Sequence, residues 1–448
     1  MRVEKKTIYG WGRTRKVNAS THAPSEVSQV KIPNDWCRIA RGGGRSYNDA
    51  SVLADGLVIE TCKLRRVKSF NDERGTLKIE AGALLSDVLA FIVPRGWFLA
   101  VTPGTKRASV GGCVAADVHG KNHHRAGAFG KYVRELELLT VDGEILRLSP
   151  EENSEVYRAT IGGMGLTGLI LNATLQLIPI ETSLISVRCR RTKDLDDSLG
   201  VFDEHYLDDE YTVAWIDCLA NKKELGRGVF VSGHHATREE IGIGSLERPI
   251  YEPRKEYTLP DFVPKWVLNR WSMRAFNLCY YLMKGRKEQN FFSRIDEFFY
   301  PLDAVTNWNV LYGRKGFSQY QCVFPTAQAE RGIKKIIQAL SRSRIPCFLC
   351  VLKRLGAKGD GLLSFPIPGY TLALDLPADE GIEELVHEFD RIVVESQGRI
   401  YLAKNPIVRK ELLKEMYAEL PQWIESKDQL DPRHRFRSDM STLFGLTR

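Results

Sequence analysis

The sequence lacks any long hydrophobic run. No stretch approaches the ~18 consecutive apolar residues typical of a membrane-spanning helix, and residues 1–10 are charged rather than apolar. We therefore expect a cytoplasmic protein without a signal peptide, which contacts a membrane at most at its periphery.

The sequence also lacks a block of one charge. Lys and Arg number 64 against 56 Asp and Glu, which gives a net charge of +8. No Lys/Arg run or recognition-helix signature is present, so no nucleic-acid partner is expected. The charge suits a phosphate-bearing substrate or an anionic membrane surface. No repeat or low-complexity segment interrupts the 448 residues, a length that predicts two or three domains.

The sequence has few patterns of cysteine or of metal-ligating residues that would predict a disulfide framework or a metal site. Nine scattered cysteines favour a reducing compartment over a disulfide framework. Cys347 and Cys350 form the one C-x-x-C, inside an apolar run that predicts a buried strand with two core thiols. His119, His123 and His124 have no nearby carboxylate or cysteine to complete a metal set, so we expect them in a polar pocket wall.

Glycine, in contrast, is concentrated in blocks. Three consecutive glycines lie in the segment Arg41–Asp49, where they cost backbone entropy and bury no side chain. Free backbone N–H groups on such a loop form an anion-binding concavity suited to a pyrophosphate. The segment predicts a phosphorylated cofactor.

Two further glycine-rich segments bear on the cofactor. Thr102–Thr105 and Ser109–Asn122 are almost entirely small residues, which fits either a close-packed helix or the wall beside a flat ligand. Gly163–Gly168 matches G-x-G-x-x-G, but a helix-like segment precedes it and a strand follows. That order is the reverse of the Rossmann context, so we reject an NAD site in this chain.

The predicted elements suggest an α+β protein. Strands are expected at 57–60, 76–80, 137–141 and 169–178, with a type I′ hairpin at Asp142-Gly143 and a helical segment over Ser86–Val93 with Ser86 as its N-cap. Residues 318–403 follow a β-α-β-β-α-β order, with helices at 326–342 and 379–396 and a last strand at 399–403.

Residues 245–300 are basic and aromatic, and include Trp266, Trp271, Arg286 and Lys287. This stretch fits a membrane interface, which we assign to 254–300, or a helical cover over a cleft. We favour the packing role.

Two lysines stand at the ends of predicted strands. Lys353 follows Val351-Leu352, and Lys404 follows Tyr401-Leu402-Ala403. Such lysines are usually solvated, but two that converge on a pocket can have a lowered pKa and act as bases.

With these motifs, the chain resembles the FAD-dependent oxidoreductases of the vanillyl-alcohol oxidase type. Arg41–Asp49 is similar to their pyrophosphate loop, and Val110–Gly112 and Gly163–Gly168 to their other flavin contacts. A closer similarity, to members that oxidise a lipid-linked ribose, rests on Gly10–Arg13, His119–His124, Ser364–Gly369 and Ala403-Lys404.

The resemblance implies the architecture. A two-lobed FAD-binding domain would span 1–182 and be completed by 399–448. The substrate-binding domain, 183–398, would hold a mainly antiparallel sheet covered by helices.

The resemblance also implies the reaction. The ribose 2′-hydroxyl of a polyprenylphosphoryl-β-D-ribose would be oxidised to the 2′-keto sugar, the first half of an epimerisation to arabinose for cell-envelope arabinan. An NAD(P)H-dependent short-chain reductase would complete it. The alternatives are an oxygen-using oxidase of free alditols or sugar lactones, and a flavin-free binding protein.

The site residues are implied in the same way. Lys404 would be the base or the hydroxyl-orienting group, with His119 and Lys353 beside it. The substrate contacts would be Tyr47, Tyr300, Gln321, Lys353 and Lys404. The FAD contacts would be Arg41, Gly42, Gly43, Gly44, Arg45, Ser46, Tyr47, Thr102, Pro103, Gly104, Gly111, Gly112, Ala115, Asp117, Gly120, Asn122, Gly168, Ile170 and Tyr401.

The chain departs from its relatives at three places. Arg45 stands where many members carry a histidine bonded to the flavin, so we expect non-covalent FAD. Ala373 stands where close relatives often have a cysteine, so thiol-directed inhibitors should lack their target. The segment Asn18–Pro33 is shortened, and Ser25–Ile32 is expected to form a stub of a helix.

Overall fold

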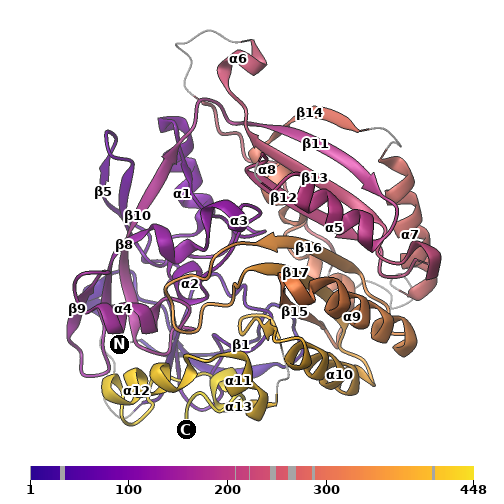
Figure 1. The fold of residues 1–448 in the computed structure, drawn as a ribbon. Helices are drawn as coiled ribbons and strands as arrows, with labels where there is room; N and C mark the ends of the chain where they lie inside the picture. Colours follow the sequence, from indigo (N-terminus) through magenta and orange to yellow (C-terminus); the bar gives the residue numbers. More distant parts are fainter. Residues whose placement is uncertain are drawn as a thin grey trace.

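The computed structural model describes residues 2–30, 36–206, 208–220, 222–242, 249–260, 269–284, 288–405 and 409–448. Within them the strands form three sheets (Figure 1). The first has the order β1-β2-β4-β3. Its strands are β1 (Glu4–Ile8), β2 (Val17–His22), β4 (Leu57–Glu60) and β3 (Arg38–Arg41), the last three parallel.

The second sheet has the order β5-β6-β10-β8-β9, and β7 also pairs with β10. Its strands are β5 (Val67–Asn71), β6 (Thr76–Glu80), β10 (Leu169–Pro179), β8 (Val133–Leu139), β9 (Ile145–Leu148) and β7 (Trp97–Leu99). The helices between these strands are α1 (Leu85–Ile92), α2 (Val110–Ala115), α3 (His123–Ala126) and α4 (Ser154–Thr160).

The third sheet has the order β14-β11-β13-β12-β16-β17-β15-β18 and is antiparallel throughout. Its first half contains β11 (Leu184–Thr192), α5 (Leu195–Glu204), β12 (Tyr211–Ile216), β13 (Gly228–His235), α6 (Arg238–Ile241), α7 (Arg270–Met283) and β14 (Gln289–Arg294). The second half contains β15 (Phe317–Pro325), α9 (Ala329–Ser343), β16 (Leu349–Leu355), β17 (Gly369–Pro377), α10 (Ile382–Glu395) and β18 (Arg399–Ile400), and α8 (Ile295–Phe299) lies between the halves.

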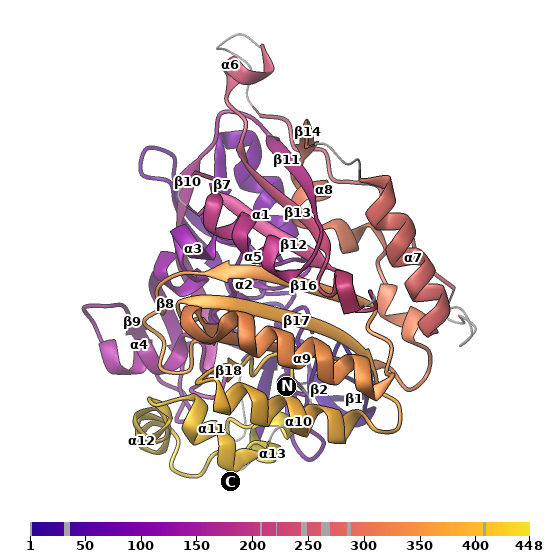
Figure 2. The same ribbon diagram turned by 45° about the vertical axis from the view of Figure 1, so that its right-hand side comes forward.

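The third sheet contains a structural repeat that the sequence does not show. Each half runs β-α-β-β-α-β with its fourth strand at the outer edge, and the halves meet where β12 pairs with β16. The β-α-β-β-α-β order predicted for 318–403 is confirmed in the second half. Helices α9 and α10 cover the outer face of that half (Figure 2), and the apolar residues Ile333, Ile336, Ile337 and Leu340 of α9 are fully buried.

The last residues pack against α4 and against the first sheet. They form α11 (Lys410–Met416), α12 (Leu420–Leu430) and α13 (Asp439–Leu443). Trp423 of α12 donates from Nε1 to the Ala159 carbonyl at 3.0 Å, and the Arg38 guanidinium lies 5.2 Å from the Phe436 ring centre. β18, by contrast, extends the third sheet. The domain division at 182 and 399 remains a prediction.

Several local predictions differ from the structure. The hairpin between β8 and β9 exists, but Thr140 N–H bonds Glu144 O and only Gly143 has positive φ, at 87°. The loop therefore has three residues, and the type I′ prediction is wrong, because that turn needs two positive φ values. Ser86 is not the N-cap of α1; Leu84 is, and its N–H donates to Asp87 at 3.2 Å.

Two more predicted segments are shorter than expected. The last strand stops at Ile400 instead of Ala403, because the Lys404 N–H turns back to Tyr401 O at 3.0 Å. Within Ser25–Ile32 a 3₁₀ turn spans Val27–Gln29, while residues 31–35, like Trp266, Arg286 and Lys287, lie outside the described part of the chain. No helix in the described part is long and apolar enough to cross a membrane.

Candidate active site

One cavity of about 1030 Å³ connects the glycine-rich segments with the third sheet. On the glycine side it is lined by Gly42–Tyr47, Thr102–Thr105 and parts of α2. On the sheet side it is lined by alternate residues of consecutive strands, as expected for one face of a sheet.

The loop Gly42–Ser46 has the geometry of an anion cradle. Among the described residues, none accepts a hydrogen bond from its five backbone N–H groups. The loop is fixed at its end by Tyr47 N–H bonding Ala403 O at 3.1 Å and by Trp11 N–H bonding Ser46 O at 2.8 Å. Donors held open in this way suit a pyrophosphate.

The glycines are required because the loop packs on the second glycine-rich block. A Cβ on Gly42 would lie 1.9 Å from Ser109 Oγ, and one on Gly43 would lie 2.1 Å from the Arg107 carbonyl oxygen. Ser109 caps α2 by accepting from the Gly112 N–H at 3.2 Å. The second block therefore forms both a short Gly/Ala helix and a wall of the cavity, so the two alternatives that its small residues suggested are compatible.

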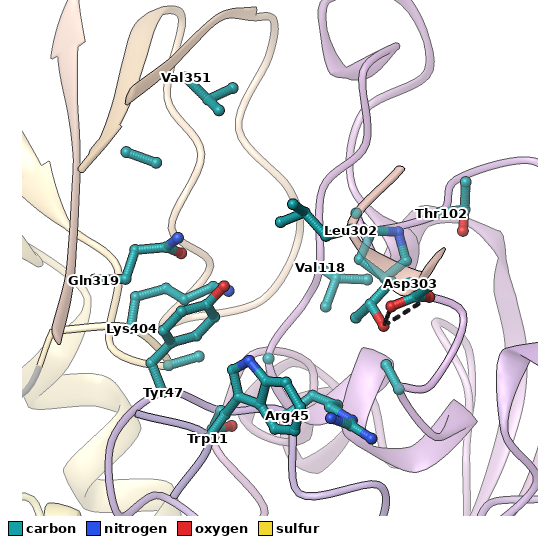
Figure 3. A pocket seen from close by; sticks show the side chains of 18 of the residues that line it. Trp11, Arg45, Tyr47, Thr102, Val118, Leu302, Asp303, Gln319, Val351 and Lys404 are labelled. Atoms are coloured by element: carbon teal, nitrogen blue, oxygen red, sulfur yellow. Dashed lines mark hydrogen bonds between the residues drawn. The ribbon is translucent and has the colours of Figure 1, made fainter. Parts of the chain in front are cut away.

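Most of the predicted FAD contacts line this cavity. They are Gly42, Gly43, Gly44, Arg45, Ser46, Tyr47, Thr102, Pro103, Gly104, Gly111, Gly112, Ala115, Gly120, Gly168, Ile170 and Tyr401. Arg45 lies over the Trp11 ring, 3.9 Å from its centre, at the base of the site (Figure 3). The position therefore presents a guanidinium stacked on Trp11, and the non-covalent attachment of FAD stays a prediction.

Three predicted FAD contacts lie behind the lining instead. Arg41 donates to Tyr9 O at 2.9 Å, Asp117 accepts from the Gly130 N–H at 2.8 Å, and Asn122 donates to Ala100 O at 2.8 Å. These bonds hold the backbone of the cradle and of the second block, so the structure places the three residues as supports.

The polar end of the cavity brings together residues far apart in the sequence. Lys404 Nζ lies 3.8 Å from the centre of the Tyr47 ring. Gln321 Nε2 donates to His119 Nε2 at 2.9 Å, and Lys353 lines the same cavity. Figure 3 shows Lys404, Tyr47 and Gln319 on one wall, with Leu302 and Asp303 on the opposite one.

Burial changes the ionisation of this end. It lowers the pKa of Lys404 to about 7, a value that Asp375 raises and Lys353 lowers. Burial also lowers the pKa of Lys353 to about 8. It lowers the pKa of Lys121 to about 7, and the charge of Lys353 contributes to this shift. Lowered lysine pKa values of this kind suit proton transfer near neutrality.

His119 is a neutral group at this site. Burial, and then the charge of Lys353, hold its pKa well below the usual range. Because Gln321 donates to Nε2, the proton sits on Nδ1, which has no partner among the described residues. A buried donor without a partner is costly, so it indicates a bound acceptor.

The other two histidines are used in packing. His123 Nδ1 accepts from the Gly356 N–H at 3.0 Å, and His124 Nε2 donates to Asp209 O at 3.1 Å. No group of metal-ligating side chains occurs in the described part of the chain. Cys347 and Cys350 are buried free thiols, as predicted.

One predicted substrate contact lies outside the lining, and several lining residues were missed. Tyr300 is buried behind the wall, where its hydroxyl bonds Thr102 Oγ1 at 2.6 Å. Asp375, Gln319 and Tyr312 line the polar end, and both Gln319 and the Tyr312 hydroxyl donate to Asp375. The signal for Asp375 was its place two residues after Ala373, on the same face of a strand.

Comparison with known proteins supports the cofactor. The FAD binding domain family matches residues 28–149, and the D-arabinono-1,4-lactone oxidase family matches residues 324–443. Decaprenylphosphoryl-beta-D-ribose oxidase of Mycolicibacterium smegmatis is 35% identical over 97% of this chain and 96% of its own length. The chain belongs to the decaprenylphosphoryl-β-D-ribose oxidase family.

Members of this family have the α+β fold of the vanillyl-alcohol oxidase type, and this chain is an FAD-dependent oxidoreductase. Two other relatives are similar over most of this chain. An uncharacterized protein in the mprA 5′ region of Streptomyces coelicolor is 34% identical over 79% of this chain and 98% of its own. L-gulono-1,4-lactone dehydrogenase of Mycobacterium tuberculosis is 22% identical over 89% of this chain and 88% of its own.

Proposed function

We propose that the protein uses FAD to oxidise the 2′-hydroxyl of a polyprenylphosphoryl-β-D-ribose to the 2′-keto sugar. The supporting observation is the convergence of three half-buried amines, those of Lys121, Lys353 and Lys404, at the polar end of the cavity. Lys353, which is charged at neutral pH, favours an anionic substrate such as a sugar phosphate, whereas free alditols and lactones carry no charge to match it.

The residues divide the work of removing a hydride from a carbinol carbon. When bound, FAD supplies the hydride acceptor. The carbon releases hydride only as its O–H loses a proton, and Lys404, with a pKa of about 7, is the base that takes it. Lys353, with a pKa of about 8, stays charged at neutral pH and holds the phosphate. The free Nδ1–H of His119 and the Gln321 amide orient the sugar.

The proposal also includes the reaction that follows the oxidation. The keto sugar would be reduced on its other face by an NAD(P)H-dependent short-chain reductase, which completes the epimerisation to arabinose for cell-envelope arabinan. We place the oxidase in the cytoplasm with its FAD bound non-covalently through the Gly42–Ser46 cradle.

The test is anaerobic reduction of the purified holoenzyme. Farnesylphosphoryl-β-D-ribose should bleach the flavin absorbance, while D-ribose, an alditol and L-gulono-1,4-lactone should leave it oxidised. The match to the lactone oxidase family over residues 324–443 makes the lactone the most informative comparison. Bleaching by the lactone but not by the lipid-linked ribose would overturn the proposal in favour of a sugar-lactone oxidase.

A further inference from the structure

Helix α7 carries apolar side chains on two sides, and Arg270, Arg274 and Asn277 lie together on another. Met273 and Tyr280 face the cavity, while Trp271 and Leu282 on the other side of the helix are 78% and 59% exposed. Large apolar side chains that stay exposed together mark a surface that contacts a protein or a membrane. Trp271 and Leu282, with Leu278 at 42%, form such an exposed set in the described part of the chain.

Exposed apolar side chains also occur on the cavity side of α7 and on β14. Phe276 of α7 and Phe291 of β14 both line the cavity, yet they are 57% and 44% exposed. Phe292, the next residue of this edge strand, is 47% exposed. In both ribbon views α7 lies at the margin of the molecule, away from the first two sheets (Figures 1 and 2). We call Trp271, Phe276, Leu282, Phe291 and Phe292 the mouth surface.

An apolar wall leads from the mouth surface into the cavity. Across β11, β13 and β12 the cavity side of the sheet carries no charged residue. The lining residues there are Val187, Cys189, Val229, Val231, Val213 and Trp215. On β16 the same face continues through Leu349 and Val351 to Lys353. The wall therefore changes from hydrocarbon at the mouth to cationic at the catalytic end.

The charges on helix α7 and at its end have one sign. Helix α7 contains Arg270 and Arg274 and no carboxylate, and Lys284 follows it directly. No acidic side chain in the described part of the chain lies within ion-pair distance of these three cations. Apolar side chains flanked by unpaired cations are the pattern that binds anionic lipid surfaces.

We propose that the mouth surface docks on an anionic lipid bilayer, and that the apolar wall guides the isoprenoid chain of the substrate from the bilayer to Lys353 and Lys404. The identity of the chain rests on the proposed function, but the docking on lipid does not. A membrane accounts for the geometry because the polyprenyl chain of the substrate is itself held in a bilayer, and its headgroup must leave that surface to reach the flavin.

The docking is tested with vesicles of phosphatidylcholine alone and with added phosphatidylglycerol. The holoenzyme should sediment with the anionic vesicles and much less with the neutral ones. The double variant Trp271→Ser/Leu282→Ser should lose at least tenfold in vesicle affinity. The matched control Ile145→Ser/Leu443→Ser removes two side chains of similar exposure, 54% and 58%, from other surfaces and should bind like the wild type.

Activity assays separate this inference from the proposed function. With farnesylphosphoryl ribose in solution, the double variant should turn over at the wild-type rate, since neither residue lines the cavity. With a long-chain substrate in anionic vesicles it should lose most of its activity. KM should also fall as the soluble chain lengthens from methyl to geranyl to farnesyl.

Two results would overturn the inference. One is vesicle binding by the double variant equal to that of the wild type; the other is absence of wild-type binding to anionic vesicles, which would assign the mouth surface to a protein partner. A KM independent of chain length would refute the role of the apolar wall. If no phosphoryl ribose reduced the flavin, the proposed function would fail while the sedimentation result would stand.

Discussion

The proton acceptor gives the sharpest prediction, because its neighbours act on it in opposite directions. A base with a pKa of about 7 and a phosphate-binding cation with a pKa of about 8 together produce a bell-shaped profile. The active form of the enzyme has Lys404 neutral and Lys353 charged. For this form, kcat/KM should rise about sixfold from pH 6 to a maximum at about pH 7.5 and fall by a similar factor toward pH 9.

Substitutions should move the two limbs separately. Asp375 raises and Lys353 lowers the pKa of Lys404. Asp375→Asn should therefore shift the ascending limb to lower pH. Lys353→Met should shift it to higher pH and abolish the descending limb. Lys404→Met should reduce flavin reduction by about 10²–10⁴-fold, the usual contribution of a general base, and Lys404→Arg should not restore it.

The assay is anaerobic stopped-flow reduction of the flavin by farnesylphosphoryl ribose across pH 5.5–9.5, with kcat/KM as the readout for the free enzyme. An ascending limb that survives in Lys404→Met would refute the assignment of the base. Shifts of the same sign in Asp375→Asn and Lys353→Met would refute the electrostatic account, since it requires opposite signs.

Three further outcomes are expected. Gly43→Ala places a Cβ 2.1 Å from the Arg107 carbonyl oxygen and should weaken FAD binding by about ten- to hundredfold in flavin-release titrations. The control Gly200→Ala, whose Cβ would have no heavy atom within 4 Å, should retain FAD. Ala373→Cys should gain a mass adduct at position 373 with a thiol-directed inhibitor, and failure to label this cavity-lining position would contradict its accessibility. Lys427→Met leaves the buried Asp431, 2.5 Å from Lys427 Nζ, without its cation and should lower the free energy of unfolding by about 3–5 kcal/mol; Lys335→Met at the exposed pair with Glu395 should cost only about 0–1 kcal/mol in the same denaturation series.

Local sequence features predicted the cofactor cradle well, because its chemistry is local. Three glycines in a row have few uses, and two of them make close contacts with Ser109 and with the Arg107 carbonyl. The second half of the third sheet was equally predictable from the sequence, since α9 and α10 have strong amphipathic periodicity and lie between segments with clear strand patterns.

What the sequence did not predict depends on tertiary contacts. His119 and Gln321 are bonded across a separation of 202 residues, a pairing that no spacing rule reaches. The repeat in the third sheet is invisible in the sequence because it conserves strand order, not residues. Arg41, Asp117 and Asn122 stand in the right segments, but their side chains turn to backbone groups behind the cavity.

The central claim is that the C2′ hydrogen of a lipid-linked ribose leaves as hydride at the Lys404 end of the cavity. The direct measurement is the anaerobic rate of flavin bleaching with farnesylphosphoryl ribose deuterated at C2′ and, separately, at C3′. We predict a primary isotope effect for the C2′ label alone and a 2′-keto product. Bleaching that is insensitive to deuterium at C2′ but slowed by deuterium at another carbon would contradict the account.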